Sequence, residues 1–435
     1  MFKKILPLNL ILFLRFFGLF LVLPLISFYA YNLEGSTPLL VGVVIGGYAL
    51  TQAIFQIPFG ILSDKFGRRN LIVFGLILFL VGSIISYLAT DIYTLIAGRL
   101  LQGAGAIGSV ISATVSDLIQ EEKRGKAMAI IGGSIAMSFA LAMIFGSTIG
   151  AYYGVDILFL ITSVLAFISI FVAFKIPETG KIEFKYRKDG AKHNLFSDKT
   201  IVYFFFSSLL QKGIMSIIFM IIPIILLQNG YMEKTDIWQL YVPAMFVGLL
   251  AMGPAVILGE KKGKPKTVFV ASSFLFIIVS VLISLNDPQM TIVALFLFFI
   301  AFNLIEPLIQ SMVSKLVKAN EKGKVLGYTN SFAYFGTFLG GTGAGLLLNI
   351  DANSTETLGY ILVVLSVIWF VWSLIIENPT PKGNLYLEYS DEVEQKLEKA
   401  NFEFIDEWYI NRTENLIIVK FDKTKYSEDE LQKHF

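Results

Sequence analysis

Long apolar runs separated by short polar loops dominate the chain. A helix that crosses a bilayer needs about 20 apolar residues, and twelve segments reach that length. We expect these membrane helices over residues 5–31, 38–62, 70–89, 92–118, 127–152, 156–176, 200–228, 237–258, 265–285, 289–314, 325–349 and 358–376. The pattern therefore predicts an all-α membrane protein with twelve transmembrane helices.

The end of the chain follows a different pattern after Pro381. Residues 384–389, 402–410 and 414–421 alternate as strands do, and the last two are placed as a hairpin. Residues 390–400 and 427–435 have the pattern of short helices. The order β-α-β-β-α predicts a small α+β ferredoxin-like module over residues 383–435, without the last strand.

Basic residues gather in alternate loops, whereas the opposite loops carry mostly acids and Lys234 as their one base. Positive charge marks cytoplasmic loops, so we expect both termini in the cytoplasm. The helices also repeat as two halves, because residues 58–68 have counterparts in residues 254–264 at a constant offset. The predicted domains are an N-terminal six-helix bundle, a cytoplasmic linker, a C-terminal six-helix bundle and the module, over residues 1–176, 177–199, 200–380 and 383–435.

Composition agrees with a membrane protein and removes several kinds of chemistry. Hydrophobic residues make up 55% of the chain and charged residues 16%, with a mean hydropathy of +0.70. Cysteine is absent, and the two histidines, His193 and His434, lie in polar segments. We therefore expect no metal site, no cofactor and no thiol chemistry. No nucleophile–base pair or phosphate loop is recognisable, so an enzyme is not expected.

One charged turn joins the second and third helices. It contains Gly60, Asp64, Gly67, Arg68 and Arg69, and the spacing G-x-x-x-D-x-x-G-R-R resembles the first signature loop of the major facilitator superfamily of secondary transporters. Asp117 and Arg124 lie at the cytoplasmic ends of neighbouring helices. Together these charges can pair as a gate that biases a conformational equilibrium. The alternative is a loop whose positive charge serves only to set topology, although that would not explain the acids.

The resemblance covers about residues 5–376. Arg99, Gln102 and Gly103 match the family's R-x-x-Q-G signature, and residues 15–24, 52–64 and 303–306 are similar to the bacterial YajR group. That group is similar to drug efflux transporters and carries a small ferredoxin-like domain after helix twelve. The resemblance implies the fold of two pseudo-symmetric six-helix bundles and proton-driven export across the bacterial inner membrane. The Gly-Pro pair that efflux members carry in helix five is absent from residues 146–150.

Ionisable groups inside membrane helices are costly, so each is a candidate for function. Arg15 could face the cavity and attract an anionic group, or extend its side chain to the headgroups. In the family the arginine at Arg99 is associated with proton coupling, and the alternative is a tie between helix ends. Glu306 is the leading proton carrier, and a structural acid paired with Lys212 is the alternative.

Polar side chains on otherwise apolar helices are candidates for the substrate cavity. The second helix presents three of them at a spacing of four residues, and an interhelical hydrogen-bond seam is the alternative to a cavity lining. The candidates are Tyr48, Gln52, Gln56, Gln211, Lys212, Asn303, Asn330 and Tyr334.

We therefore expect a proton-coupled efflux transporter of the inner membrane that acts on small, possibly lipophilic, drug-like molecules by alternating access. Its partners are the small-molecule substrate, protons and the bilayer; no nucleic acid is expected, and the protein should act as a monomer. A metabolite exporter with the same machinery is one alternative. A membrane sensor or scaffold that uses the C-terminal module is another, from a different class.

Overall fold

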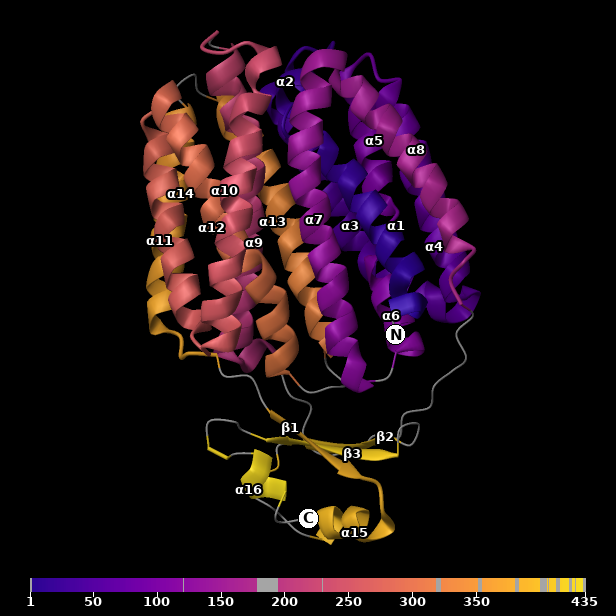
Figure 1. The fold of residues 1–435 in the computed structure, drawn as a ribbon. Coiled ribbons are helices and arrows are strands. Elements are labelled where there is room, and N and C mark those ends of the chain that lie inside the picture. Colours follow the sequence, from indigo (N-terminus) through magenta and orange to yellow (C-terminus); the bar gives the residue numbers. More distant parts are fainter. Residues whose placement is uncertain are drawn as a thin grey trace.

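The computed structural model describes residues 2–119, 121–177, 195–228, 230–317, 322–350, 354–379, 383–399, 405, 407–411, 415–421, 425–426 and 428–432. Within these residues, twelve segments are long and apolar enough to cross a membrane. The expected number of spans is confirmed, and each overlaps its expected segment. Figure 1 shows the spans standing side by side, with the N-terminus and the C-terminal module at the same end. We call this the lower end and the opposite one the upper end.

The first half comprises eight helices. They are α1 (Phe2–Leu21), α2 (Ile26–Tyr31), α3 (Pro38–Phe66), α4 (Arg68–Tyr87), α5 (Ile92–Ala104), α6 (Gly108–Leu118), α7 (Glu121–Tyr153) and α8 (Val155–Ala173). The second half comprises α9 (Lys199–Pro223), α10 (Trp238–Val256), α11 (Pro265–Ser284), α12 (Pro288–Leu316), α13 (Lys322–Ile350) and α14 (Ser354–Ile375).

Two of the expected spans are broken. The first, expected to be continuous over residues 5–31, is interrupted between α1 and α2 at residues 22–25, which include Pro24. Proline has no N–H to donate to a helical hydrogen bond. The fourth span is interrupted between α5 and α6, where Gly105 lies against the backbone of Gly75 in α4. Hydropathy alone did not reveal either break, because the apolar character continues through both.

Several helices begin where the sequence supplies a capping side chain. Asp91 accepts hydrogen bonds from the backbone of Tyr93 and Thr94 at the start of α5, and Asp287 accepts from Met290 at the start of α12. Such caps satisfy backbone donors that have no partner within the helix. The hydrogen bonds, first of all the one from the Thr94 hydroxyl, lower the pKa of Asp91.

The two halves repeat each other in their packing. In the first half α1 packs on α7, α3 on α5 and α4 on α8; in the second, α9 packs on α13, α10 on α12 and α11 on α14. The halves meet where α3 packs on α13 and where α7 packs on α10. The fold is therefore two pseudo-symmetric six-helix bundles, as expected.

Small residues bring the backbones of the halves together at the upper end. Gly42 of α3 faces the backbone of Gly341 in α13, and a Cβ atom on Gly345 would lie 2.5 Å from the Pro38 carbonyl oxygen. Ser27 also donates a 3.0 Å hydrogen bond to the Phe219 carbonyl in α9. Small residues allow this close approach in membrane helices.

The C-terminal module contains β1 (Gly383–Glu388), α15 (Asp391–Lys399), β2 (Glu407–Asn411), β3 (Leu416–Phe421) and α16 (Glu428–Gln432). Its strand order is β1-β3-β2, with both pairs antiparallel. This split β-α-β arrangement is compatible with a ferredoxin-like module. Residues 412–414, where the turn of the hairpin was expected, lie outside the described residues.

The module has a small core of its own, and it lies below the bundles (Figure 1). Lys420 of β3 donates a 3.5 Å hydrogen bond to the carbonyl of Val317, at the lower end of α12. The module is thus joined to the helix that carries Glu306.

On the surface of the module, the Tyr389 hydroxyl donates to Glu394 and Asp391. These carboxylates raise the pKa of Tyr389 to about 12.

We expect Gly345→Ala to destabilise the protein, because the new methyl group would overlap the Pro38 carbonyl. Overpacking of this kind costs about 1–3 kcal/mol, and it should appear as a lower Tm of the purified protein. Gly343→Ala is the matched control in the same helix, since nothing lies within 4 Å of its added Cβ. Equal losses in the two variants would contradict the close contact.

Candidate functional site

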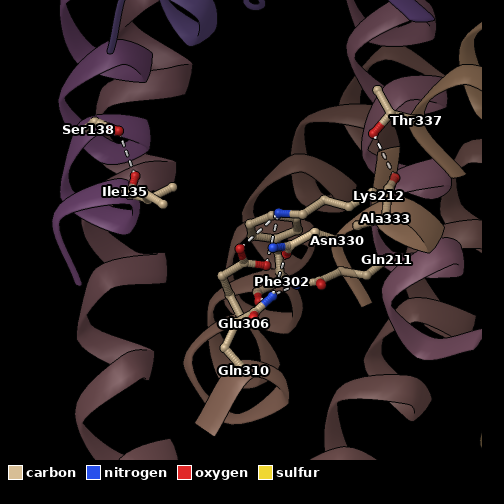
Figure 2. A network of polar contacts seen from close by, with 10 residues as sticks. All are labelled: Ile135, Ser138, Gln211, Lys212, Phe302, Glu306, Gln310, Asn330, Ala333 and Thr337. Atoms are coloured by element: carbon tan, nitrogen blue, oxygen red, sulfur yellow. Dashed lines mark hydrogen bonds and ion pairs between the residues drawn. The ribbon is translucent and has the colours of Figure 1, made fainter. Parts of the chain in front are cut away.

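An ion pair between Lys212 of α9 and Glu306 of α12 lies in the second half. The ammonium is 2.9 Å from each carboxylate oxygen, and the two side chains are 19% and 25% exposed. Lys212 also sits 4.4 Å from the centre of the Phe302 ring. Figure 2 shows the pair surrounded by polar side chains from α9, α12 and α13. Glu306 is therefore paired with Lys212, the arrangement that the sequence offered as the alternative, and it is not fully buried.

The backbone around this pair explains its position. Gly213, next to Lys212, lies against Gly340 of α13, so α9 and α13 approach closely at this point. Pro307 follows Glu306 inside α12. Because proline cannot donate a hydrogen bond, the helix lacks one rung directly after the carboxylate. The carboxylate thus stands at a locally weakened turn of α12.

Three amides near the pair are held by other groups. Gln211 donates a 3.2 Å hydrogen bond to the Phe302 carbonyl, and Asn303 donates a 2.8 Å bond to the Phe299 carbonyl. Asn330 of α13 accepts a 3.1 Å bond from Gln310 of α12. These contacts fix the orientation of the amides and join α9 and α13 to α12.

Arg15 lies in the first half and is wholly buried. One guanidinium nitrogen donates a long, 3.5 Å hydrogen bond to the Gln52 side chain, and the guanidinium lies 5.3 Å from the centre of the Phe79 ring. Its Nε and Nη1 atoms have no hydrogen-bond partner among the described residues. The alternative in which Arg15 reaches the headgroups is therefore wrong: the side chain points into the bundle.

The polar stripe of α3 faces the interior of the first half. Tyr48 lies under the Arg99 guanidinium, 4.5 Å from ring centre to carbon, while Gln52 binds Arg15. The Gln56 amide faces Gly108 at the start of α6. Tyr334 lies in α13, the second-half helix that packs on α3. The stripe therefore links the two buried arginines to the boundary with α13.

Arg99 and Gln102 form a network within the first half. Arg99 donates to the Val44 carbonyl at 3.2 Å and to the Gln102 side chain at 2.8 Å. Gln102 in turn donates to Ser83 of α4 at 2.9 Å. Both side chains are wholly buried. The network joins α5 to α3 and α4.

The charged loop lies at the lower end, away from the buried arginines. Arg68 binds Asp117 of α6 at 2.9 Å and Ser63 at 2.5 Å, and Arg69 donates to the Ile176 carbonyl at 2.7 Å. Gly67 has a positive φ of 88°, which a side chain would disfavour. Gly60 faces Ser109 at ordinary contact distance. The side chains of Asp64 and Arg124 lie outside the described residues.

The structure thus brings together some candidates and separates others. Arg15, Gln52, Tyr334 and the Lys212–Glu306 pair gather around the boundary between the halves, whereas the charged loop is apart from them. Sequence reasoning missed the aromatic contacts. Phe139 of α7 stacks on Phe302 across the boundary, with 5.3 Å between ring centres. A phenylalanine one turn before Glu306 was the available signal, but the chain has 39 phenylalanines, so no single one stands out.

Comparisons with known proteins agree with this architecture. A family model described as Major Facilitator Superfamily matches residues 8–341 and 238–419. The inner membrane transport protein YajR of Escherichia coli K12 is 32% identical over 430 residues, which cover 96% of this chain and 94% of that protein. Multidrug resistance protein 2 of Bacillus subtilis is 23% identical, covering 83% of this chain and 93% of that protein.

Solved structures show the same fold. A D-xylose–proton symporter superposes with a TM-score of 0.70 at 12% identity, covering 86% of this chain and 98% of that one. A bacterial homologue of the lysosomal transporter Spinster, in an inward-facing and occupied conformation, has a TM-score of 0.68 at 14% identity. It covers 85% of this chain and 95% of that one.

We expect Gln102→Leu to destabilise the protein, because the buried Arg99 would lose its 2.8 Å acceptor. An unpaired buried donor costs about 1–3 kcal/mol, so the Tm should fall. Gln239→Leu is the control, since Gln239 is exposed near the upper end. A variant of Gln102 that unfolds at the temperature of the unchanged protein would contradict the network.

Proposed function

The chain belongs to the major facilitator superfamily of transporters, and from that premise we propose that it is a proton-coupled exporter of small, lipophilic molecules. The observation that carries the proposal is the partly exposed Lys212–Glu306 pair next to the boundary between the halves. A carboxylate in this position can bind and release a proton when access to it changes. The name of the Bacillus subtilis relative, a multidrug resistance protein, supports export as the direction.

The coupling step follows from the pair. When Glu306 takes up a proton it loses its charge, and the attraction that holds Lys212 at 2.9 Å is lost. Lys212 then leaves as a free cation or turns to another acceptor, and α9 and α12 are no longer held together at this point. The weakened turn at Pro307 favours movement of α12 here. Release of the proton restores the pair.

The arrangement of the halves supports alternating access. Backbone contacts between glycines of α3 and α13 close the upper end. With the lower end placed in the cytoplasm, this is an inward-facing form. We place both termini in the cytoplasm, on the side of the basic loops. The Escherichia coli relative is named an inner membrane transport protein, which supports the same membrane for this protein.

The charged loop is proposed as part of the lower gate. The Arg68–Asp117 pair joins the start of α4 to the end of α6, so it stabilises the surface that the second half would meet when the lower end closes. It lies within the first half, and it does not itself bridge the halves. The protein is proposed to work as a monomer, because each chain has both halves of the site.

Transport-linked proton movement tests the coupling. In proteoliposomes under an imposed pH gradient, the unchanged protein should show substrate-dependent proton flux with a panel of lipophilic compounds. Glu306→Gln should lose this flux and keep downhill exchange of substrate, because the glutamine cannot exchange a proton. Glu233→Gln, at an exposed position of the upper end, is the control. Proton flux that survives in Glu306→Gln would move the proton carrier elsewhere.

Asp117→Asn tests the gate. The pair is partly exposed, with side chains 16% and 32% accessible, so its loss should cost at most about 1 kcal/mol of stability. The initial rate of transport should fall by at most about fivefold, the effect of a ~1 kcal/mol bias between the two conformations. Asp117→Glu should restore much of the rate. Asp236→Asn is the control, and equal rates in the two asparagine variants would contradict a role in gating.

A further inference from the structure

Positive charge exceeds negative charge in the middle of the described bundle. Arg15 and Arg99 are wholly buried, and Lys212 already has Glu306 as its partner. Arginine stays protonated at any physiological pH, so its charge has to be balanced by a partner. Arg99 has two hydrogen bonds and the face of Tyr48. Arg15 has one long bond to an uncharged amide and lies over the rings of Phe16 and Phe79. Of the two arginines it has the fewer hydrogen bonds, and two of its nitrogens have no partner in the described residues.

The unpaired polar atoms around Arg15 are mostly donors. In the described residues, the buried atoms without a partner along this part of α1, α3 and α5 are Arg15 Nε and Nη1, Gln52 Nε2, Arg99 Nη2 and Gln56 Oε1. Four of these five atoms donate and one accepts. Buried polar groups are rarely left without a partner. A group with negative charge and several acceptor positions would satisfy this set, whereas a cation would not.

Arg15 also lies at the boundary where the halves move. Arg15 contacts Gln52 of α3, and α3 packs on α13 of the second half. A ligand held by the guanidinium would therefore lie beside the two helices through which the halves meet, where an alternating-access transporter binds its substrate.

A row of aromatic rings leads from Arg15 to the Lys212–Glu306 pair. Phe16 stacks on Phe20 with ring centres 5.5 Å apart, and Phe20 meets Phe139 edge to face at 5.1 Å. Phe139 stacks on Phe302 at 5.3 Å, and Phe302 lies under Lys212. Such rings favour a flat apolar body, because aromatic groups pack well against each other.

We propose that Arg15 is the subsite for the carboxylate of an amphipathic aromatic acid, whose apolar body packs along this row of rings. The proposal rests on the proposed transport function and narrows it, because it makes an organic anion the preferred substrate class. Gln52 is the positioning residue, since its amide holds the guanidinium and offers an unpaired N–H beside it.

The test uses three probes of the same shape and different charge: 2-naphthoate, 2-naphthylmethylammonium and 2-naphthylmethanol. They are added to the purified full-length protein at neutral pH in a low-salt buffer, and the Tm is followed. Only 2-naphthoate should give a saturable rise in Tm. Arg15→Gln should bind it about tenfold to a hundredfold more weakly, the loss of a charge-assisted hydrogen bond, and Arg15→Lys should bind with intermediate affinity.

Gln52→Glu keeps the test independent of any folding defect in the Arg15 variants. The new carboxylate would stand next to the guanidinium and act as a built-in counter-ion. We expect this variant to unfold at a higher temperature than the unchanged protein and to lose the response to 2-naphthoate. Gln239→Glu, at an exposed position near the upper end, is the control. It should gain no stability and keep the response.

The proposal would be overturned by equal shifts with the three probes, by no shift with 2-naphthoate, or by an unchanged response in Gln52→Glu. Equal stabilisation by chloride at the same ionic strength would also overturn it, because the site would then take a small inorganic anion. The binding measurement needs neither a proton gradient nor transport. A failure here therefore leaves proton flux through Glu306 untouched, and loss of that flux leaves the binding result standing.

Discussion

The cost of placing charge in a bilayer governs the interior of this protein. Arg15, Arg99, Lys212 and Glu306 all lie within membrane helices, where an unpaired charge is expensive. Lys212 and Glu306 satisfy each other, and Arg99 is held by carbonyl and amide oxygens. Arg15 is held least, by one long bond to Gln52, and two of its nitrogens are unpaired among the described residues. The proposed substrate site is at Arg15, where this balance of charge is incomplete. The proposed coupling site is at Lys212 and Glu306, where a proton can undo the balance.

Helix packing determines where those charges can be. Glycines let α3 approach α13 and α9 approach α13 backbone to backbone, which places α13 between the two halves of the site. Asn330 of this helix accepts a hydrogen bond from Gln310, one turn after Glu306. The glycine contacts between α3 and α13 also close the upper end. Movement at the boundary between the halves is therefore linked through α13 to rearrangement of the charged groups.

The C-terminal module adds a contact at the lower end of α12. Lys420 donates to the carbonyl of Val317, near the C-terminus of the helix, where carbonyl groups lack intrahelical partners and a cation is favourable. Glu306 and Pro307 lie further up the same helix. The module therefore contacts the lower end of α12, and the ion pair lies further up the same helix. Only the ion pair faces the boundary between the halves.

The sequence by itself determined the twelve spans, the repeat of the two halves and the order of elements in the C-terminal module. Apolar length, periodicity and spacing are local properties that a chain carries in its order of residues. It named the charged groups and offered Lys212 as a partner of Glu306, but only as an alternative, because Lys212 and Glu306 are 94 residues apart. The inward direction of Arg15 likewise depends on α3 and α4. The breaks between α1 and α2 and between α5 and α6 also came only from the structure, since the apolar runs continue through them. Which helices become neighbours is decided by tertiary packing, and in a membrane that packing alone decides which buried charge finds a partner.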